Sequence, residues 1–119
     1  MDFHTNTPIY IQIMDEVKRL IVIGQYTCND KIPPVRELAM TFGVNPNTVQ
    51  RALSELERDG LLVSERTNGR FVTSDASIIQ ALKESILNEK IDQFIFEVKE
   101  FQFDQDDLLC RLKEKLQHE

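Results

Sequence analysis

The sequence has few of the residues from which catalytic or metal centres are built. Only two cysteines, Cys28 and Cys110, and two histidines, His4 and His118, occur among its 119 residues. The cysteines form no CxxC pair, and neither histidine has a cysteine or carboxylate at the spacing of a metal site. Glycine-rich phosphate loops and nucleophile motifs are also missing. These absences predict a protein that is not an enzyme and that uses no metal or cofactor.

Long apolar runs are missing too. The longest, from Leu20 to Ile23, is far shorter than the roughly 20 residues that a membrane-spanning helix needs. The N-terminus has neither the basic region nor the apolar region of a secretion signal. We therefore expect a cytoplasmic protein with reduced thiols and no membrane partner.

The chain also lacks an excess of positive charge. It carries 14 lysines and arginines against 20 acids, a net charge of −6, which counts against coating nucleic acid through bulk charge. Residues 1–75 carry 8 basic and 10 acidic residues, whereas residues 76–119 carry 6 and 10. A protein that binds one DNA site needs only a local basic face, and acids elsewhere limit adhesion to other DNA. Site-specific DNA binding is therefore compatible with this charge.

Three helices are predicted before residue 60. The first, over residues 8–23, has apolar side chains at spacings of three and four, which form one apolar stripe. Thr7 is its expected N-cap, and Pro8 its expected first residue, where the missing N–H costs nothing. Gly24 is expected to end it.

The next two helices have the spacing of a helix-turn-helix. We expect the second over residues 35–42, followed by a tight turn at Gly43. The third begins at Asn45, an N-cap, has Pro46 in its first turn, and ends at Gly60. Its apolar residues fall on one side and its polar residues on the other. Two short helices joined by a tight turn that contains glycine have the shape of a helix-turn-helix unit.

Two short β-prone runs follow, on either side of Asn68-Gly69. Asn-Gly is a strong hairpin signal, because a type I′ turn needs positive φ at both central residues. We expect a β-hairpin here, the wing of a winged helix.

Beyond residue 75 the sequence is strongly helical. Apolar residues with spacings of four, three, four and three form a heptad seam of Leu87, Ile91, Phe94, Val98 and Phe101. The seam could pack within one subunit against the first helix, but it would leave a large apolar patch on a monomer, and we therefore favour dimerisation. The predicted fold class is mainly α with a small β-hairpin. It consists of a winged helix-turn-helix over residues 1–75 and a two-helix C-terminal dimerisation tail over residues 76–119.

The segment PPVRELAMTFGVNPNTVQRALSELERDGLLVSERTNGRFV resembles the winged-helix DNA-binding domain of the GntR family of bacterial regulators. The matching motifs are Arg36-Glu37-Leu38-Ala39, Gly43-Val44, Thr48-Val49, Glu57-Arg58-Asp59-Gly60-Leu61 and Phe71-Val72, with Pro8 to Ile13 similar to the family's first helix. Only about 45 residues follow, as in the short YtrA-type subfamily, whose two tail helices pair between subunits. The resemblance implies a transcriptional repressor, often of an operon with transporter genes.

The resemblance also implies which residues contact double-stranded DNA. These are Arg36 on phosphate or base, Asn45, Pro46, Asn47, Thr48 and Gln50 on the third helix, and Asn68, Gly69 and Arg70 at the wing tip along the minor groove. Two positions depart from the family. Pro34 stands where many members have serine, and Pro46 where many have arginine. We therefore expect an unusual operator and more reliance on Arg36, Arg51 and Arg70.

The chemistry of these side chains supports the same interpretation. In the major groove, asparagine and glutamine amides pair with adenine and a threonine methyl meets thymine, which predicts an A·T-rich half-site. Asn45 has an equal claim to be only a cap, whereas for Gln50 and Arg51 we favour DNA contact. Arg36, Arg66 and Arg70 could instead be surface charges paired with nearby acids, which contribute under about 1 kcal/mol. We favour DNA contact for Arg36 and Arg70 because of where the start of the second helix and the wing point, and leave both interpretations open for Arg66.

The leading hypothesis is a homodimeric repressor on a palindromic operator with half-sites about 10 base pairs apart. Counting Arg36, Arg51 and Arg70 once per subunit gives about six contacts per dimer, and a slope of log affinity against log salt near −5. The alternative is a winged-helix module that binds a protein through the same face, although that face has no apolar patch. A small-molecule effector is compatible with the first hypothesis, and the sequence identifies neither that effector nor the operator.

Overall fold

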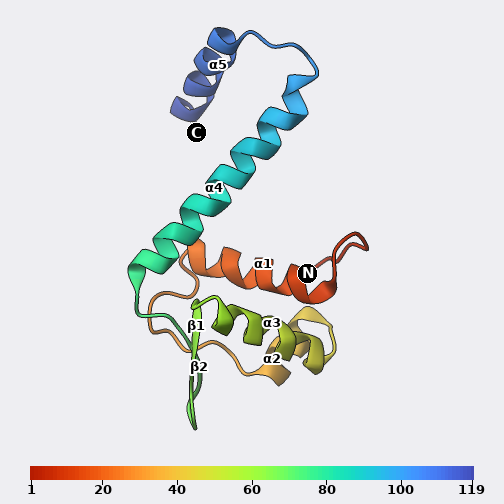
Figure 1. The fold of residues 1–119 in the computed structure, drawn as a ribbon, viewed down its shortest axis with the longest axis vertical. Coiled ribbons are helices and arrows are strands. Elements are labelled where there is room, and N and C mark those ends of the chain that lie inside the picture. The colour runs from red at the N-terminus through yellow and green to blue at the C-terminus, as the bar shows by residue number, and fades with distance from the viewer. The chain divides into compact units, whose positions relative to one another are not determined.

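The computed structural model describes residues 1–119 and divides them into two compact units, residues 1–83 and 84–119. Five helices and one two-stranded antiparallel sheet make up the chain (Figure 1). In chain order these are α1 (Ile9–Val22), α2 (Val35–Phe42), α3 (Pro46–Arg58), β1 (Leu62–Glu65), β2 (Gly69–Val72), α4 (Ala76–Lys99) and α5 (Gln105–Gln117). This confirms the predicted fold class, a mainly α winged helix-turn-helix with one hairpin, followed by two further helices. None of the helices combines the length and the apolar character needed to cross a membrane.

α1 begins one residue later than the sequence predicts. Pro8 is its N-cap (φ −53°, ψ 144°), and the carbonyl oxygen of Pro8 accepts the first helical hydrogen bonds from the amides of Ile11 and Gln12. The expected Thr7 cap is wrong, because the hydroxyl of Thr7 lies one residue upstream of the capping position. The carbonyl oxygen of Thr7 instead accepts a 2.8 Å hydrogen bond from Nε2 of Gln12.

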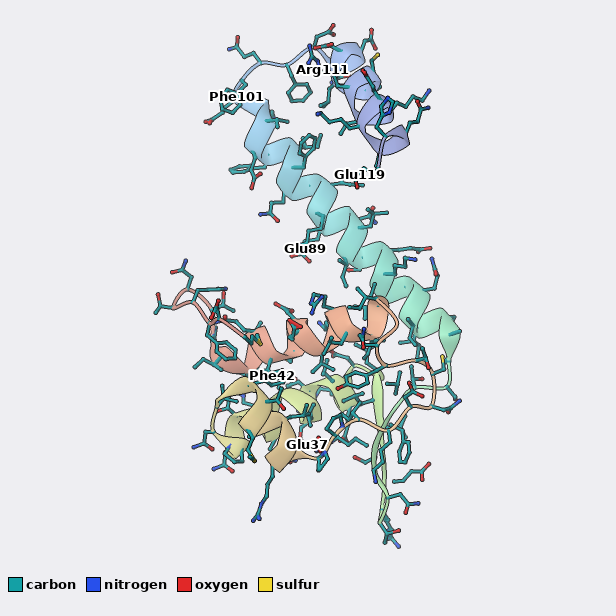
Figure 2. All side chains as sticks on the ribbon, turned by 180° about the vertical axis from the view of Figure 1, so that it is seen from behind. Glu37, Phe42, Glu89, Phe101, Arg111 and Glu119 are labelled. Carbon is teal, nitrogen blue, oxygen red and sulfur yellow. The ribbon has the colours of Figure 1, made fainter.

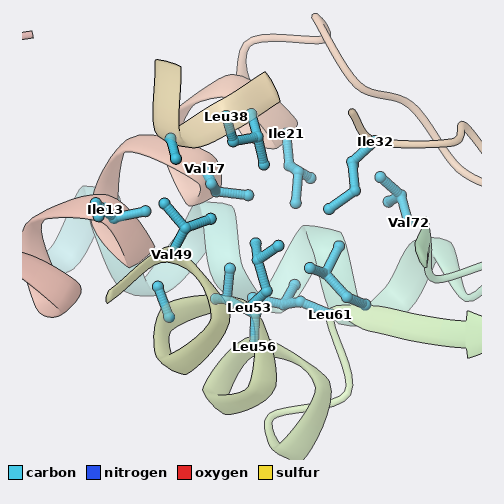
Figure 3. Packing of buried hydrophobic residues seen from close by; sticks show 13 residues of the cluster. Ile13, Val17, Ile21, Ile32, Leu38, Val49, Leu53, Leu56, Leu61 and Val72 are labelled. Carbon is cyan, nitrogen blue, oxygen red and sulfur yellow. The ribbon is translucent and has the colours of Figure 1, made fainter. Parts of the chain in front are cut away.

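One apolar core holds the first unit together, and most of it lies between α1 and α3 (Figure 3). Its residues, each at most 5% exposed, are Ile13, Val17 and Ile21 of α1, Leu38 and Ala39 of α2, Val49, Ala52, Leu53 and Leu56 of α3, and Ile32, Leu61, Leu62 and Val72 outside the helices. Full burial of one such aliphatic side chain contributes about 1.5–3 kcal/mol. The apolar periodicity of α3 therefore determines which side of this helix faces inward and which side remains exposed.

The wing is a hairpin, but its turn differs from the prediction. β1 and β2 pair in register from Leu62 opposite Val72 to Glu65 opposite Gly69, so three residues connect the strands instead of two. A 3.2 Å hydrogen bond from the amide of Asn68 to the carbonyl of Glu65 closes this turn. Gly69 has a φ of 97°, whereas the φ of Asn68 is not positive. The type I′ assignment is therefore wrong: only the glycine takes the left-handed conformation, which costs it little.

The segment that leads into α2 forms an extra edge beside the hairpin. Lys31 pairs with Phe71 of β2 in an antiparallel bridge. The amide of Ile32 donates a 3.0 Å hydrogen bond to the carbonyl of Arg70. These bonds fix the backbone around Lys31 against the wing.

The first turns of α4 belong to the first unit. Ile78, Ile79 and Leu82 pack against its core, and this unit extends to Lys83. The domain boundary that the sequence suggests, at residue 75, lies earlier, between the end of β2 at Val72 and the start of α4 at Ala76. The difference arises because apolar residues that cover the core continue past the hairpin into the helix.

Four seam residues of α4 are at least partly exposed in the single chain. Leu87 and Ile91 expose 59% and 47% of their surface, and Phe94 and Val98 are half-buried. At about 100° per residue, these four lie nearly opposite the side of α4 that packs on the core of the first unit. A row of partly exposed apolar side chains therefore runs along this part of α4 in the single chain.

Phe101 does not continue this seam, which corrects the prediction. α4 ends at Lys99, and Phe101 lies beyond it in the connection to α5 with 75% of its surface exposed (Figure 2). The amide of Phe101 donates a 3.0 Å hydrogen bond to the carbonyl of Val98, three residues back, and Gln102 after it has a φ of 54°, so the chain has left the α-helix at Phe101. α5 begins after this turn, with Asp104 as its N-cap.

Candidate nucleic-acid interface

A tight turn joins α2 to α3. Gly43 has φ 69° and ψ 39°, a left-handed conformation that glycine adopts at little cost. The amide of Val44 donates a 3.0 Å hydrogen bond back to the carbonyl of Ala39. The two helices therefore form the helix-turn-helix that the sequence predicts.

Asn45 caps α3. Its Oδ1 accepts a 2.8 Å hydrogen bond from the amide of Asn47, and Pro46 occupies the first helical turn. The cap satisfies one of the amides that the start of a helix leaves free. Asn45 is exposed, and its side-chain nitrogen has no hydrogen bond within the chain. The capping role is therefore present, and contact of this nitrogen with DNA stays a prediction.

Replacing Asn45 with alanine is expected to lower the free energy of unfolding by about 1 kcal/mol, because α3 loses its cap. Asn45→Ser is the matched control, since serine caps a helix nearly as well but has no amide to offer a base. Urea unfolding followed by circular dichroism measures both variants. An alanine variant as stable as the unchanged protein would contradict the cap, and a stable serine variant with weakened operator binding would support a second role in DNA contact.

The outer side of α3 is polar. We call this surface the exposed face of α3, and it consists of Asn47, Gln50, Arg51 and Ser54. Nε2 of Gln50 makes only a 3.4 Å hydrogen bond to Oγ of Ser54, which is near the limit of such bonds and leaves the amide available. Thr48 is half-buried. Because none of the exposed large apolar side chains lies on α3, this face suits the polar edges of bases better than an apolar protein surface.

Arg51 is held by a residue that the sequence analysis missed. Its guanidinium carbon lies 3.8 Å from the centre of the Tyr10 ring on α1. A cation over an aromatic face is attracted to it, which restricts the positions that the Arg51 side chain occupies. No sequence signal links the two residues, because only the packing of α1 against α3 brings them together.

Arg36 is exposed in the first turn of α2. It forms no ion pair with the adjacent Glu37 or with any other acid. α2 starts after Pro34, which has no side-chain cap to offer, as expected where serine is absent. The charge of Arg36 is therefore available to an external anion.

Arg70 has a different position from the wing-tip contact that the resemblance implies. Its guanidinium pairs with the carboxylate of Glu57 on α3, and the two side chains are only 17% and 29% exposed. The hydroxyl of Ser64 on β1 donates a 2.6 Å hydrogen bond to the same carboxylate. This cluster ties the wing to α3 and compensates the charge of Arg70 inside the protein. Contact of Arg70 with DNA stays a prediction.

The tip of the wing is exposed. Arg66 lies there without an ion pair, next to the predicted contacts Asn68 and Gly69. Nδ2 of Asn68 makes a long 3.4 Å hydrogen bond to the carboxylate of Glu65. The tip therefore presents one free arginine and one weakly bonded amide to solvent.

Stability in acid is expected to depend on Glu57. Partial burial raises the pKa of this carboxyl group, but hydrogen bonds from Ser64 and Arg70 and the positive charge of Arg70 outweigh it, so the pKa lies below its ordinary value of 4.5. A carboxyl group whose pKa is lowered by folding stabilises the protein above its unfolded pKa, and this contribution is lost as the pH falls through the folded pKa. The loss is therefore expected below about pH 4.5.

The check is the melting temperature of the protein and of Glu57→Gln between pH 3 and 7. The variant is expected to be less stable at pH 7, with the two curves converging in acid. Hydrogen bonds from Ser77 lower the pKa of Asp75 as well, but this group titrates in both proteins and cancels in the comparison. Parallel curves would show that the ionised Glu57 contributes nothing.

Comparison with known proteins places this geometry among transcription regulators. Residues 9–72 match the family model described as "Bacterial regulatory proteins, gntR family". The chain is 36% identical over 111 residues to the uncharacterized HTH-type transcriptional regulator YhcF of Bacillus subtilis, covering 93% of this chain and 92% of that protein. It is 36% identical over 99 residues to the HTH-type transcriptional repressor YtrA of the same organism, covering 82% and 75%.

Solved structures give the same result. A GntR family transcriptional regulator from Listeria monocytogenes superposes with a TM-score of 0.86 at 34% identity, covering 94% of this chain and 98% of that one. The DNA-binding domain of AraR, in complex with its operator ORR3, superposes with a TM-score of 0.56 at 33% identity, covering 61% and 88%. The likeness to the Listeria protein thus extends over nearly the whole chain, and the likeness to the DNA complex over little more than half of it.

Proposed function

Because this chain belongs to the gntR family of bacterial regulatory proteins, which are DNA-binding transcription regulators and not enzymes, we propose that it represses transcription as a homodimer bound to a palindromic operator. The repressor assignment follows the name of its relative YtrA. By resemblance to such short regulators, we further propose that the repressed operon contains transporter genes. We also propose that the protein acts in the cytoplasm.

The observation that carries DNA binding is the polar, exposed face of α3 on a firmly packed helix. Asn47, Gln50 and Arg51 project from it, while the opposite side of α3 is buried. Amides and guanidinium groups on a helix that follows a tight turn suit recognition of base edges in the major groove. The free charges of Arg36 in the first turn of α2 and of Arg66 at the tip of the wing suit the DNA backbone.

The seam of α4 supports the dimer. Leu87 and Ile91 would bury their exposed surface in a pair of seams, whereas on a monomer they remain in water. Two copies related by a two-fold axis present two α3 helices and two wings, which matches two half-sites about 10 base pairs apart. A small-molecule effector stays a prediction with no site assigned to it.

The experiment is fluorescence anisotropy of the purified protein with DNA from the promoter upstream of its own gene, with scrambled competitor and over a salt series. We expect sequence-selective binding whose log affinity falls against log salt with a slope near −5. The variant Gln50→Ala/Arg51→Ala is expected to lose the selective binding. Arg111→Ala/Gln117→Ala removes the same two residue types from exposed positions of α5 and is expected to bind normally.

Two results would overturn the proposal. Equal binding to promoter and scrambled DNA would show that the protein does not recognise a DNA sequence. A slope near zero would show that it makes no electrostatic contact with the DNA backbone. Either result would leave the same face available for a protein partner, which a pull-down with the double variant as control would then test.

A further inference from the structure

Arg70, the arginine that the sequence assigns to the wing, does not offer a free charge there. Glu57 and Ser64 hold Arg70 against α3, so its charge is already compensated. We propose that Lys31, which precedes α2, binds a phosphate of the DNA backbone beside the wing. This inference rests on the proposed function, since it names a further residue of the same interface.

The backbone of Lys31 is part of the wing. Its bridge to Phe71 and the adjacent 3.0 Å hydrogen bond from Ile32 to Arg70 attach it to β2 as an edge segment. A residue fixed in this way keeps its place when the wing meets DNA. Lys31 therefore behaves as a wing residue although it lies far from the wing in the sequence.

The side chain of Lys31 lies against the turn of the hairpin. A Cβ placed on Gly69 would come within 3.2 Å of Cε and 4.0 Å of Nζ of Lys31. Gly69 thus leaves room for the lysine, in addition to supplying the positive φ of 97° that the turn requires. The two residues together bring an ammonium group to the tip of the wing.

A hollow of about 410 Å³ opens at this place. Its walls come from the segment 31–35 and from residues 67–70 of the wing. Lys31 is exposed there and forms neither an ion pair nor a hydrogen bond through its ammonium group. The hollow therefore has one free positive charge, which is suited to an anion.

The chemistry of lysine favours phosphate over a base. An ammonium group is a hydrated point charge on a flexible stem, without the planar fork that pairs with a guanine edge. Contacts of this kind fix the position of a protein on the duplex and carry no sequence information. Lys31 is therefore expected to raise affinity for all DNA and to leave sequence preference unchanged.

Lys31→Ala is the test, measured by anisotropy with operator and scrambled DNA over a salt series. Each phosphate contact contributes about 0.9 to the salt slope, so the loss of two per dimer is expected to reduce its magnitude by about 2. Affinity for both DNAs is expected to fall several-fold and by the same factor. Lys113→Ala in α5 removes the same charge from another exposed position, and Lys31→Arg keeps the charge; both are expected to retain the slope.

The outcomes separate this inference from the proposed function. If the unchanged protein binds its operator with the expected slope and Lys31→Ala does the same, Lys31 is not a contact and the regulator remains. A loss confined to the operator would also overturn the inference, because it would mark a base contact. If the unchanged protein shows no salt-dependent DNA binding, the proposed function fails and the inference fails with it.

Discussion

Ile91→Glu is expected to convert the proposed dimer to a monomer and to lower operator affinity by about 100-fold or more. Ile91 exposes 47% of its surface in the single chain, so glutamate is tolerated there without disturbing a monomer. In the paired seam, the same change would place two carboxylates in an apolar contact, where an unpaired charge is strongly disfavoured. A monomer binds only one half-site. It therefore loses the gain in affinity that comes from binding two linked half-sites at once, typically a factor of 10²–10⁴.

Analytical ultracentrifugation and anisotropy measure the two parts of this prediction. The salt slope is expected to fall to about half, because one subunit makes half of the phosphate contacts. Ser85→Glu adds the same charge to an exposed position of α4 away from the seam and is expected to leave the dimer intact. A dimeric Ile91→Glu variant with full affinity would rule out the seam as the interface.

Leu53→Ala is expected to lower the free energy of unfolding of the winged-helix unit by about 3 kcal/mol. Leu53 is 1% exposed on the inner side of α3 and belongs to the core that α1 and α3 enclose (Figure 3). Truncating a buried leucine removes apolar burial and leaves a cavity that neighbouring residues only partly fill, at a cost of about 2–5 kcal/mol. For a unit of this size, the melting temperature is expected to fall by more than about 10 °C.

Leu53→Met is the matched control, since a swap that conserves volume costs under about 1.5 kcal/mol. Urea unfolding measures both variants at neutral pH. If the alanine variant lies within about 1 kcal/mol of the unchanged protein, α3 is not packed as the structure has it. DNA binding of Leu53→Ala below its melting point is expected to stay selective, because the exposed face of α3 is unchanged.

Local signals in the sequence predicted most of the fold. Breakers and caps located α2 and α3 closely, because Gly43 and Asn45 act within a few residues of their own position. The hairpin followed from Asn68-Gly69 in the same way. The turn type did not, because strand register also depends on how Leu62 and Val72 are buried, and this is a property of the whole core.

The contacts that the sequence did not reveal join segments that lie far apart in the chain. The pairing of Arg70 with Glu57 and the stacking of Arg51 on Tyr10 depend on the packing of the wing and of α1 against α3. The sequence did not indicate that Lys31 lies at the wing for the same reason, because only its bridge to β2 brings it there. Phe101 was wrongly placed in the seam because a heptad pattern does not reveal where its helix ends.

The division of α3 into two sides has a consequence for how such proteins diverge. The residues that hold the helix in the core and the residues that face outward are separate sets. Under the proposed function, a copy that arises by gene duplication can therefore change its exposed amides and acquire a new target promoter without losing its fold at any step. Only Arg51, which rests on Tyr10, links the two sets, and we expect these two positions to change together among descendants of such a duplication.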